Sequence, residues 1–392
     1  MTGSDRKGID RKGIDRIGID IEQFMRDPYG TGIQRVLQYL AKEWPRDVPA
    51  DFLVPAGDGL LRRLTPQQAA ELISVPFAAH PPEVDLRGAV DAQVDALDAP
   101  VIAVADLPDA YGAWLLPEVS YLPAVLERFE AARRTMRTAM IGYDTLPMTE
   151  PANYRFKPGL AAWVSEYFRM LAVADDVACI SAYARDSILG RLRRDPALPI
   201  RVAHPGGDHI AIREGAPPQR PRFCRVGTME ARKRPVEILQ GFIRAVDAGL
   251  DAELRFVGRR SPSNAAINAT IDDAIAAGYP VTWVEGASDA EVVEFIRTSS
   301  VFLSIGIEGY GIPVLEAIRV GTPVVYDGIQ PAAEVMQGRG AMRIAAGTEA
   351  EMTGMFGGAV QHLDRLRAEL DPEGVPTWHA FAADVAAAVS VR

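Results

Sequence analysis

The sequence predicts an α/β protein of two domains, each a doubly wound parallel sheet flanked by helices. The first observation is length, since 392 residues exceed one ordinary domain and fit two of about 150–200 residues each. The second is rhythm, because short apolar runs alternate with amphipathic stretches from Ile17 onward. The third is a break in that rhythm at residues 212–221, whose proline-rich, polar composition is typical of a linker.

The composition allows two buried cores and excludes several classes of function. Hydrophobic residues make up 48% of the chain, and its net charge of −10 argues against nucleic acid as the main partner. Cys179 and Cys224 lie inside apolar runs without CxxC spacing, which indicates neither a disulfide nor a metal site. Without a run of about 18 apolar residues or the apolar segment of a signal peptide, we expect a cytoplasmic protein that spans no membrane. Nothing in the composition indicates an oligomeric state.

Residues 1–16 are expected to form a disordered arm. They carry a five-residue repeat that begins with Asp5-Arg-Lys-Gly-Ile9, and the third copy merges into the first expected strand, Ile17–Ile21. The first two copies are too polar and too short to pack. Their basic residues could touch anionic lipid, but Asp5 and Asp10 dilute that charge, so we interpret the arm as a dispensable extension.

Residues 17–211 are expected to form the first domain. Its clearest strands are Ile17–Ile21, Pro100–Ala105, Thr138–Tyr143, Asp176–Ser181 and Arg201–His204. Helices are expected at Gly32–Trp44, Val119–Thr135 and Ala161–Ala174. The stretch from Asp58 to Asp98, rich in proline and alanine, has no clear pattern and is not assigned.

Residues 222–377 restart the same alternation after the linker. Strands are expected at Arg222–Val226, Glu253–Val257, Val281–Val284, Val301–Ile305 and Pro323–Tyr326. Helices are expected at Arg234–Ala248, Ala265–Ala277, Asp289–Thr298 and from Pro313. A last helical stretch, Trp378–Val389, lies within residues 378–392.

The most informative motif is Glu308-Gly-Tyr-Gly-Ile-Pro-Val-Leu-Glu316, which follows an expected buried strand. Its glycines and the N–H groups of the helix that begins at Pro313 can seat a nucleotide diphosphate. Glu308 would face whatever is attached to the diphosphate, and Glu316 would lie toward the nucleoside, because carboxylates accept hydrogen bonds from sugar hydroxyls. The alternative is an ordinary loop-to-helix junction in which Glu316 only offsets the helix dipole.

With its continuation Gly321-Thr-Pro-Val-Val325, this motif resembles the signature of retaining GT-B glycosyltransferases, and of glycosyltransferase family 4 in particular. The resemblance covers nearly the whole chain and is weakest at residues 58–98. It implies two Rossmann-like domains with a deep cleft between them. The N-terminal domain would bind the acceptor, the C-terminal domain the donor, and the helix at 378–392 would cross back to the N-terminal domain. The implied donor contacts are Glu308 to the sugar, Glu316 to the ribose, and the backbone of Gly309, Tyr310, Gly311 and Ile312 to the diphosphate.

A second motif, Gly227-Thr-Met-Glu-Ala-Arg232-Lys233, follows the first strand of the second domain. Two cations at a helix entrance can neutralise the charge on a departing diphosphate without a metal. The resemblance assigns Arg232 and Lys233 to the phosphates, with Gly227 and Thr228 beside them. The alternative is a solvated basic helix start, which would be poorly placed against the helix dipole.

Near the N-terminus, Tyr29-Gly30-Thr31-Gly32-Ile33 opens the first long helix. Gly30, Thr31 and Gly32 resemble the family's glycine loop, which approaches the donor phosphate or the acceptor. The alternative is an ordinary tight turn.

The main departure from the family lies at Tyr143-Asp144, where many relatives place a histidine before an aspartate near the reacting sugar. A tyrosine can hydrogen-bond a sugar hydroxyl, but it cannot act as a base near neutral pH as histidine can. We therefore expect Asp144 to be the more important residue, accepting the acceptor's proton.

Metal or cofactor binding is not expected. The five histidines do not cluster, and no Asp-x-Asp follows an expected strand. His204 and His209 flank the glycine turn at residues 205–208 and are interpreted as hinge and cleft-wall residues. Arginine clusters such as Arg133-Arg134 are interpreted as solvated faces, although relatives with lipid-linked acceptors use such surfaces for peripheral contact with the inner face of the membrane.

The resemblance thus implies a metal-independent, retaining glycosyltransferase. It would move a hexose or deoxyhexose from a GDP-, dTDP- or UDP-linked donor to a glycan, lipid-linked or small-molecule acceptor. Two alternatives stay open: a catalytically silent GT-B module that partners an active transferase, with Tyr143 as a sign of decay, and a sugar-nucleotide epimerase. The intact Glu308, Glu316, Arg232 and Lys233 argue against the first, and the glutamate pair argues against the second.

Overall fold

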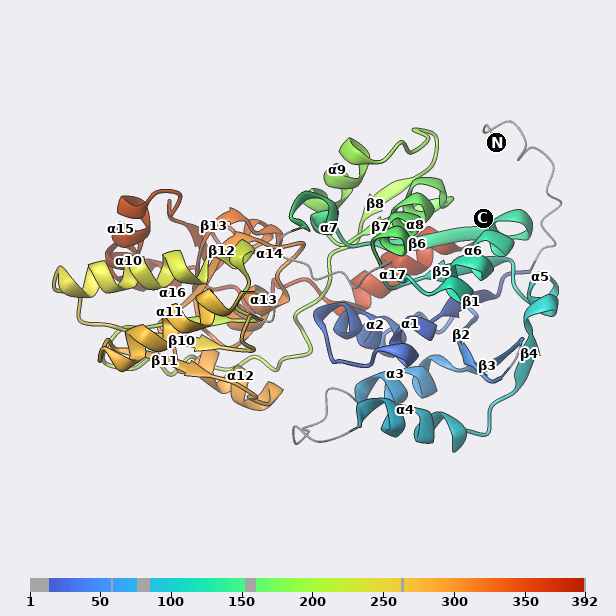
Figure 1. Ribbon diagram of the computed structural model, residues 1–392, viewed down its shortest axis with the longest axis horizontal. Helices are drawn as coiled ribbons and strands as arrows, with labels where there is room; N and C mark the ends of the chain where they lie inside the picture. Colours follow the sequence, from blue (N-terminus) through green and yellow to red (C-terminus); the bar gives the residue numbers. More distant parts are fainter. Residues whose placement is uncertain (1–13, 58, 76–84, 152–159, 262–263, 391–392) are drawn as a thin grey trace. The chain divides into compact units, whose positions relative to one another are not determined.

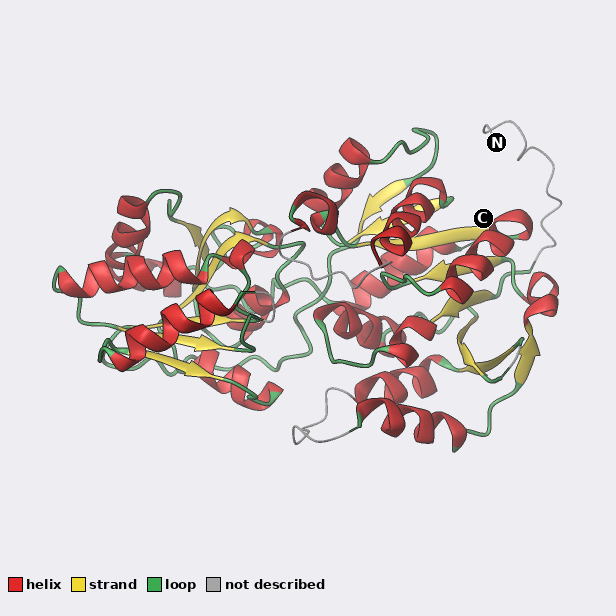
Figure 2. Ribbon diagram, in the orientation of Figure 1, coloured by secondary structure: helices red, strands yellow, loops and turns green. Residues whose placement is uncertain are grey.

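The computed structural model describes residues 14–57, 59–75, 85–151, 160–261 and 264–390, and these divide into two compact α/β units (Figures 1 and 2). Of the described residues, unit 1 contains those within 1–144, 156–204 and 378–392, and unit 2 those within 145–155 and 205–377. Residues 1–13 of the expected arm lie outside the described residues. Its last residue, Arg16, is ordered, because it pairs with Asp51 at 2.9 Å.

Unit 1 is built on an eight-stranded sheet with the order β4-β3-β2-β1-β5-β6-β7-β8. Its strands are β1 (Ile17–Asp20), β2 (Ala50–Pro55), β3 (Leu60–Leu64), β4 (Val101–Ala103), β5 (Ala113–Leu116), β6 (Arg137–Gly142), β7 (Asp176–Cys179) and β8 (Ile200–Val202). Its helices are α1 (Glu22–Arg26), α2 (Gly32–Lys42), α3 (Pro66–Ser74), α4 (Leu86–Asp95), α5 (Leu107–Ala110), α6 (Pro123–Thr135), α8 (Leu160–Val173), α9 (Ala182–Arg191) and α17 (Trp378–Val389). The prediction of a parallel sheet is confirmed except at β3, which pairs antiparallel with β2 and β4.

The stretch left unassigned by the sequence supplies β3, α3 and α4. The turn after β2 lets β3 fold back on it, where Arg63 of β3 donates to the Asp51 carboxylate of β2 at 2.8 Å. Thr65 caps α3 by accepting the Gln68 N–H, and the Gln68 side chain accepts the Thr65 N–H in return. Antiparallel pairing with β2, an ion pair between the strands and a helix cap therefore position elements that the composition of this region did not reveal.

The last helix, α17, belongs to unit 1. Trp378 at its start is 1% exposed and stacks on Tyr39 of α2, with ring centroids 4.9 Å apart. Phe381 and Val385 follow at helical spacing and are fully buried. A stripe of apolar side chains thus ties the C-terminal helix to α2 and to the strands of the first sheet.

Unit 2 is built on a six-stranded parallel sheet with the order β11-β10-β9-β12-β13-β14. Its strands are β9 (Arg222–Val226), β10 (Glu253–Val257), β11 (Val281–Val284), β12 (Val301–Ile307), β13 (Val324–Ile329) and β14 (Ala341–Arg343). Its helices are α7 (Leu146–Thr149), α10 (Pro235–Asp247), α11 (Ala265–Ala276), α12 (Asp289–Arg297), α13 (Ile312–Arg319), α14 (Pro331–Val335), α15 (Glu349–Gln361) and α16 (Leu363–Ala368), with a 3-10 turn, η4 (Ala231–Lys233).

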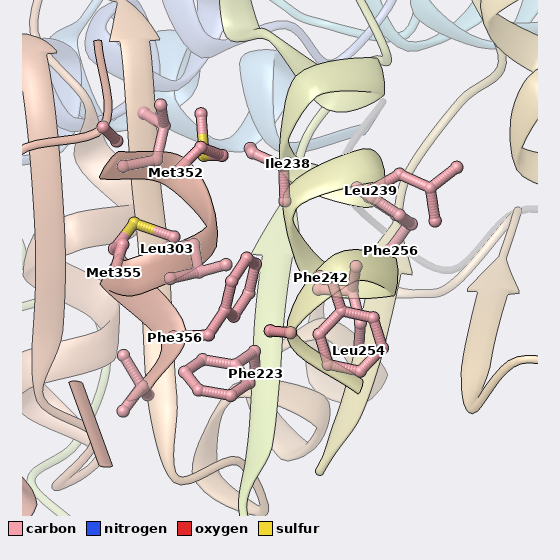
Figure 3. Packing of buried hydrophobic residues seen from close by; sticks show 14 of the residues in the cluster. Phe223, Ile238, Leu239, Phe242, Leu254, Phe256, Leu303, Met352, Met355 and Phe356 are labelled. Atoms are coloured by element: carbon pink, nitrogen blue, oxygen red, sulfur yellow. The ribbon is translucent and has the colours of Figure 1, made fainter. Parts of the chain in front are cut away.

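Three aromatic rings form the middle of the core of unit 2 (Figure 3). Phe356 of α15 packs edge-on against Phe223 of β9 at 4.9 Å and against Phe242 of α10 at 5.3 Å, measured between ring centroids. Burial of such side chains contributes roughly 1.5–3 kcal/mol each. The core fixes β9 against α10, and this holds the loop between them in place at the carboxyl edge of the sheet.

The change from unit 1 to unit 2 falls between His204 and Pro205, before the expected linker. The reason is local packing around Gly207. Its N–H donates to the Pro376 carbonyl at 2.9 Å, and a Cβ at this position would lie only 2.4 Å from Leu315 of α13. The glycine turn is therefore part of the second unit.

Candidate functional site

The Glu308 motif lies at the carboxyl end of β12, as the sequence predicts. The Glu308 N–H donates to the Ile329 carbonyl of β13 at 2.9 Å, which fixes the residue at the strand end. Gly311 precedes α13 with φ of 104°, a left-handed conformation that favours glycine, and Pro313 lies in the first turn. No described side chain caps this helix. The strand–turn–helix is confirmed, and its helix N-terminus is suited to an anion.

Glycines allow the backbones at this edge to approach one another. Gly306 has φ of 100°, and a Cβ there would lie 2.1 Å from the Arg232 carbonyl oxygen of η4. At Gly227, with φ of 120°, a Cβ would lie 2.8 Å from the Lys233 ammonium. A side chain at Gly306 would push η4 away from the end of β12, and one at Gly227 would displace the Lys233 ammonium. The glycines thus bring Arg232 and Lys233 to Glu308.

Three cations surround the Glu308 carboxylate. Arg232 Nη1 donates to Oε2 at 2.8 Å, Lys233 Nζ lies 3.1 Å from Oε1, and Arg225 Nη2 lies 3.5 Å from the same Oε1. Arg232 also pairs with Glu230 at 2.6 Å. Three positive charges therefore face two carboxylates, and these side chains are largely buried. The net charge of the cluster is positive.

The charges shift the pKa values of this cluster. Burial alone would raise the pKa of Glu308, but Lys233, Arg232 and Arg225 together hold it well below its ordinary value. Burial lowers the pKa of the Lys233 ammonium, and Glu308 opposes that effect. The Glu308 carboxylate is therefore anionic at neutral pH, and an added anion would find a positive surplus beside the N-terminus of α13.

Glu316 lies in α13 and is 8% exposed. Its Oε1 lies 2.9 Å from Nε2 of His209, whose side chain is 2% exposed. The sequence interpretation of His209 as a hinge residue did not include this pair, which joins positions 107 residues apart. His209 thus orients the carboxylate that we assign to the ribose.

The other unit 2 candidates lie along the same loops. Gly309 and Tyr310 are buried, and the Tyr310 carbonyl accepts the Ala332 N–H at 2.9 Å. Burial raises the pKa of the Tyr310 hydroxyl, so it stays protonated. Ile312 is the first residue of α13, and Thr228 accepts the Glu230 N–H through its carbonyl at 2.9 Å. Their assignment to the donor remains a prediction.

In unit 1, the loop before α2 is held by one side chain. Gln34 Oε1 accepts the N–H groups of Tyr29, Gly30 and Thr31 at 3.0, 2.8 and 3.3 Å, and Thr31 Oγ1 accepts the Gln34 N–H at 3.3 Å. This is a capping box, with Gly32 as the first residue of the helix. A ligand phosphate would have to displace Gln34 to reach these N–H groups, and the assignment of Gly30, Thr31 and Gly32 to the donor stays a prediction.

Tyr143 and Asp144 follow β6 and differ in exposure. Tyr143 is 5% exposed, its hydroxyl donates to the Pro117 carbonyl at 2.8 Å, and burial raises its pKa well above the ordinary value. Asp144 is partly exposed. The tyrosine therefore has a packing role within unit 1, and the expectation that Asp144 is the more important of the two is retained as a prediction.

A second group of titratable side chains, not predicted from the sequence, lies at the carboxyl ends of β1 and β5. Asp20 is 1% exposed and pairs with Arg128 of α6 at 2.8 Å, and Arg128 also pairs with Glu22 at 2.7 Å. Glu118 is 2% exposed, and its Oε2 accepts the Phe24 N–H at 2.9 Å. Burial, with Asp20 and Asp27 adding, raises the pKa of Glu118 to about 8. A position directly after an apolar run was the available signal for both acids.

No group of three or more histidine, cysteine, aspartate or glutamate side chains within the described part of the chain is arranged to hold a metal ion. No helix among the same residues has the length and apolar character needed to cross a membrane.

Most of unit 2 matches a known protein family. A family model described as "Glycosyl transferases group 1" matches residues 220–356, which span β9 to α15 and include Arg232, Lys233, Glu308 and Glu316. Residues 220–356 are a group 1 glycosyltransferase domain. The serotype-specific mannosyltransferase WbdA of Escherichia coli is 29% identical over 119 residues, which cover 30% of this chain and only 14% of WbdA.

Solved structures match this chain over both units. The lipopolysaccharide outer core galactosyltransferase WaaB in its apo form matches 95% of this chain and 99% of its own, with a TM-score of 0.60 and 14% identity. Sucrose-phosphate synthase from Thermosynechococcus elongatus matches 94% of this chain and 97% of its own, with a TM-score of 0.60 and 13% identity. HepE of Anabaena in complex with UDP and glucose matches 95% of each chain, with a TM-score of 0.58 and 12% identity. The likeness shows the predicted GT-B fold, and the glycosyltransferase class is shown for the matched domain, residues 220–356.

Within the glycosyltransferase domain, Arg225 is a further member of the site that the sequence analysis missed. It lies in β9, the expected strand Arg222–Val226, and unlike Arg222 at the start of that strand it is buried between apolar neighbours. A charge inside an apolar strand is costly unless it is paired. That departure from the apolar pattern was the signal for this residue.

Proposed function

We propose that this protein is a metal-independent, retaining glycosyltransferase that moves a hexose or deoxyhexose from a nucleotide-sugar donor. The observation that carries the proposal is the grouping of Arg232 and Lys233 around Glu308, at the loop that leads into α13. The net positive charge of this cluster, the uncapped N-terminus of α13 and the Glu308 carboxylate, which accepts hydrogen bonds, therefore lie together. A diphosphate with an attached sugar presents the complementary groups.

The donor diphosphate would bind at Arg232, Lys233 and the backbone of residues 309–312. Glu308 would accept hydrogen bonds from sugar hydroxyls, and Glu316, oriented by His209, would accept them from the ribose. In a front-face transfer the bond between the anomeric carbon and the phosphate oxygen breaks while the acceptor oxygen bonds to the same carbon. The acceptor proton goes to the departing phosphate oxygen, and the two cations stabilise the negative charge that develops there.

The donor nucleotide is proposed as GDP, dTDP or UDP. WbdA is named as a mannosyltransferase, whereas HepE was solved with UDP and glucose, so the two similar proteins do not favour one donor. Unit 1 is proposed to bind the acceptor, a glycan, lipid-linked or small molecule. Asp144 would accept a hydrogen bond from the attacking hydroxyl, whose proton passes to the departing phosphate oxygen and not to this carboxylate. A lipid-linked acceptor would place the enzyme at the cytoplasmic face of a membrane.

The test is thermal stabilisation of the purified protein by UDP, GDP and dTDP, repeated with Glu316→Ala. One nucleotide is expected to raise Tm more than the others, since a ligand at 100 times its Kd stabilises by about 2.7 kcal/mol. Glu316→Ala should remove most of that increase. Glu294→Ala, a change of the same type at an exposed residue that pairs with Arg297 on α12, is the matched control and should keep it.

Absence of a shift with all three nucleotides would contradict the proposal and favour a silent module. Conversion of one nucleotide sugar into another, without release of nucleoside diphosphate, would favour an epimerase. Transfer of radiolabelled sugar to an acceptor with release of the nucleoside diphosphate separates these outcomes.

A further inference from the structure

Arg225 is the most deeply buried charge of the Glu308 cluster. It is 3% exposed and lies in β9, next to β12, with Cys224 and Val226 on either side in the chain. Its Nη1 donates to the Val226 carbonyl at 3.2 Å. Within the described part of the chain, its Nη2 makes no hydrogen bond, and it lies 3.5 Å from Glu308 Oε1. Burying a guanidinium costs several kcal/mol unless a partner compensates, and Glu308 is the carboxylate that does so.

The three cations are not equivalent. The side chains of Arg232 and Lys233 are each 14% exposed and belong to the turn η4, whereas the Arg225 side chain is 4% exposed and belongs to the sheet. An incoming diphosphate can reach the first two. The Arg225 side chain is more buried and extends from β9, the strand that pairs with β12.

Donor binding therefore redistributes the partners of Glu308. Under the proposed function, the diphosphate draws Arg232 and Lys233 away from the carboxylate, which both now contact at 2.8 and 3.1 Å. Glu308 would then be a buried anion that has lost two of its three cations. A carboxylate in that position takes up a proton or turns away unless a remaining charge opposes it.

We propose that Arg225 is a positioning residue that keeps Glu308 anionic and aimed at the donor sugar once the diphosphate has engaged Arg232 and Lys233. This inference rests on the proposed function and extends it. Arg225 acts through Glu308 and does not touch the phosphates. It is the counter-ion that stays with Glu308 when the two outer cations engage the substrate.

The test compares Arg225→Met, which keeps the volume but removes the charge, with Arg225→Lys and with Arg255→Met. Arg255 lies on the adjacent strand β10 over the Phe295 ring, and its change is the matched control. Release of nucleoside diphosphate from the donor should fall about 100-fold in kcat for Arg225→Met, the loss expected when a group in contact with the substrate is misplaced. Its affinity for the nucleoside diphosphate should not change, the acid limb of its kcat–pH profile should move to higher pH, and Arg225→Lys should restore that limb.

A drop in nucleoside diphosphate affinity with unchanged kcat would make Arg225 a phosphate ligand and overturn the proposal. So would an equal loss in Arg255→Met. A second readout does not need turnover: ¹³C NMR titration of the Glu308 carboxyl with inorganic pyrophosphate bound. Glu308 should take up its proton at higher pH in Arg225→Met than in the wild type, and identical titrations would overturn the proposal.

The two readouts separate this inference from the proposed function. If the wild type binds pyrophosphate and shows the Arg225 effect on Glu308, yet releases nucleoside diphosphate from no sugar donor, only the proposed function fails. If pyrophosphate does not bind to the wild type, both fail.

Discussion

Glu308 in unit 2 and Glu118 in unit 1 are glutamates at the carboxyl ends of strands, and their surroundings are opposite. Glu308 has three cations within 3.5 Å, and they hold its pKa well below the ordinary value despite burial. Glu118 accepts one hydrogen bond from the Phe24 N–H, and its burial, with two further carboxylates near it, raises its pKa to about 8. The same residue type is therefore an anion in one unit and a neutral acid at pH 7 in the other.

The N-termini of the helices at these two sheet edges, α2 in unit 1 and α13 in unit 2, also differ in whether their N–H groups are capped. In unit 1 the N-terminus of α2 is closed, because Thr31 and Gln34 form a capping box and Gln34 also accepts the N–H groups of the preceding loop. In unit 2 no described side chain caps α13, whose Ncap is Gly311. A positive, uncapped edge suits an anionic donor, and an edge with a neutral acid and occupied N–H groups suits an uncharged ligand.

The largest effect is expected from Glu308→Gln, which removes the anion from the positive edge. Transfer should fall about 10²–10³-fold, the loss typical for an electrostatic contact to the reacting group. The nucleoside diphosphate should bind more tightly than to the wild type, since Arg232 and Lys233 no longer have Glu308 as an internal competitor. Initial rates of transfer and calorimetric titration of the nucleoside diphosphate measure the two effects.

Glu294→Gln on the surface of α12 is the matched control for that change and should alter neither quantity. Weaker nucleoside diphosphate binding in Glu308→Gln would mean that Glu308 holds the site together and does not compete with the ligand. Normal transfer would remove Glu308 from the reaction.

Features set by local patterns could be predicted from the sequence. The strand, glycine turn and Pro313 before Glu316 gave the junction of β12 and α13, because each signal acts within a few residues. The residues at 60–64 gave no clear strand signal, since Arg62 and Arg63 interrupt the apolar pattern and β3 is positioned by its antiparallel pairing with β2. Elements fixed by tertiary partners have no local signature.

The same limit applies to the site. Arg232, Lys233 and Glu308 could be assigned from motifs, and the structure brings them together. The pairing of His209 with Glu316 joins residues 107 positions apart and could not be read from either neighbourhood. Glu118 was missed because its protonation depends on burial and on nearby carboxylates, neither of which a sequence specifies.

A smaller effect, on stability, is expected from Glu118→Gln. The folded-state pKa of Glu118, about 8, lies above its ordinary 4.5, so the folded protein binds this proton more tightly than the unfolded chain does. The stability that this provides is fully present below pH 4.5 and is lost as the pH rises toward 8, at up to about 1.4 kcal/mol per pH unit. Glutamine can still accept the Phe24 N–H, and it does not titrate.

Hydrogen exchange of unit 1 amides at pH 5 to 8 measures this local stability. Protection of β1 and β5 should decline with pH in the wild type more than in Glu118→Gln. Glu127→Gln, at an exposed position of α6, is the control and should follow the wild type. Parallel declines in wild type and Glu118→Gln would show that Glu118 is ionised throughout, and the contrast with Glu308 would then be lost.

The smallest effect is expected from Thr31→Ala, which opens the closed helix end of unit 1. Loss of the Thr31 hydroxyl as acceptor for the Gln34 N–H should cost about 1 kcal/mol in the stability of α2, measured by hydrogen exchange. Thr65→Ala, which removes the equivalent capping box of α3, should cost a similar amount. Neither change should alter nucleoside diphosphate affinity if the diphosphate binds at α13. Weaker nucleoside diphosphate binding in Thr31→Ala alone would instead support the assignment of Gly30, Thr31 and Gly32 to the donor.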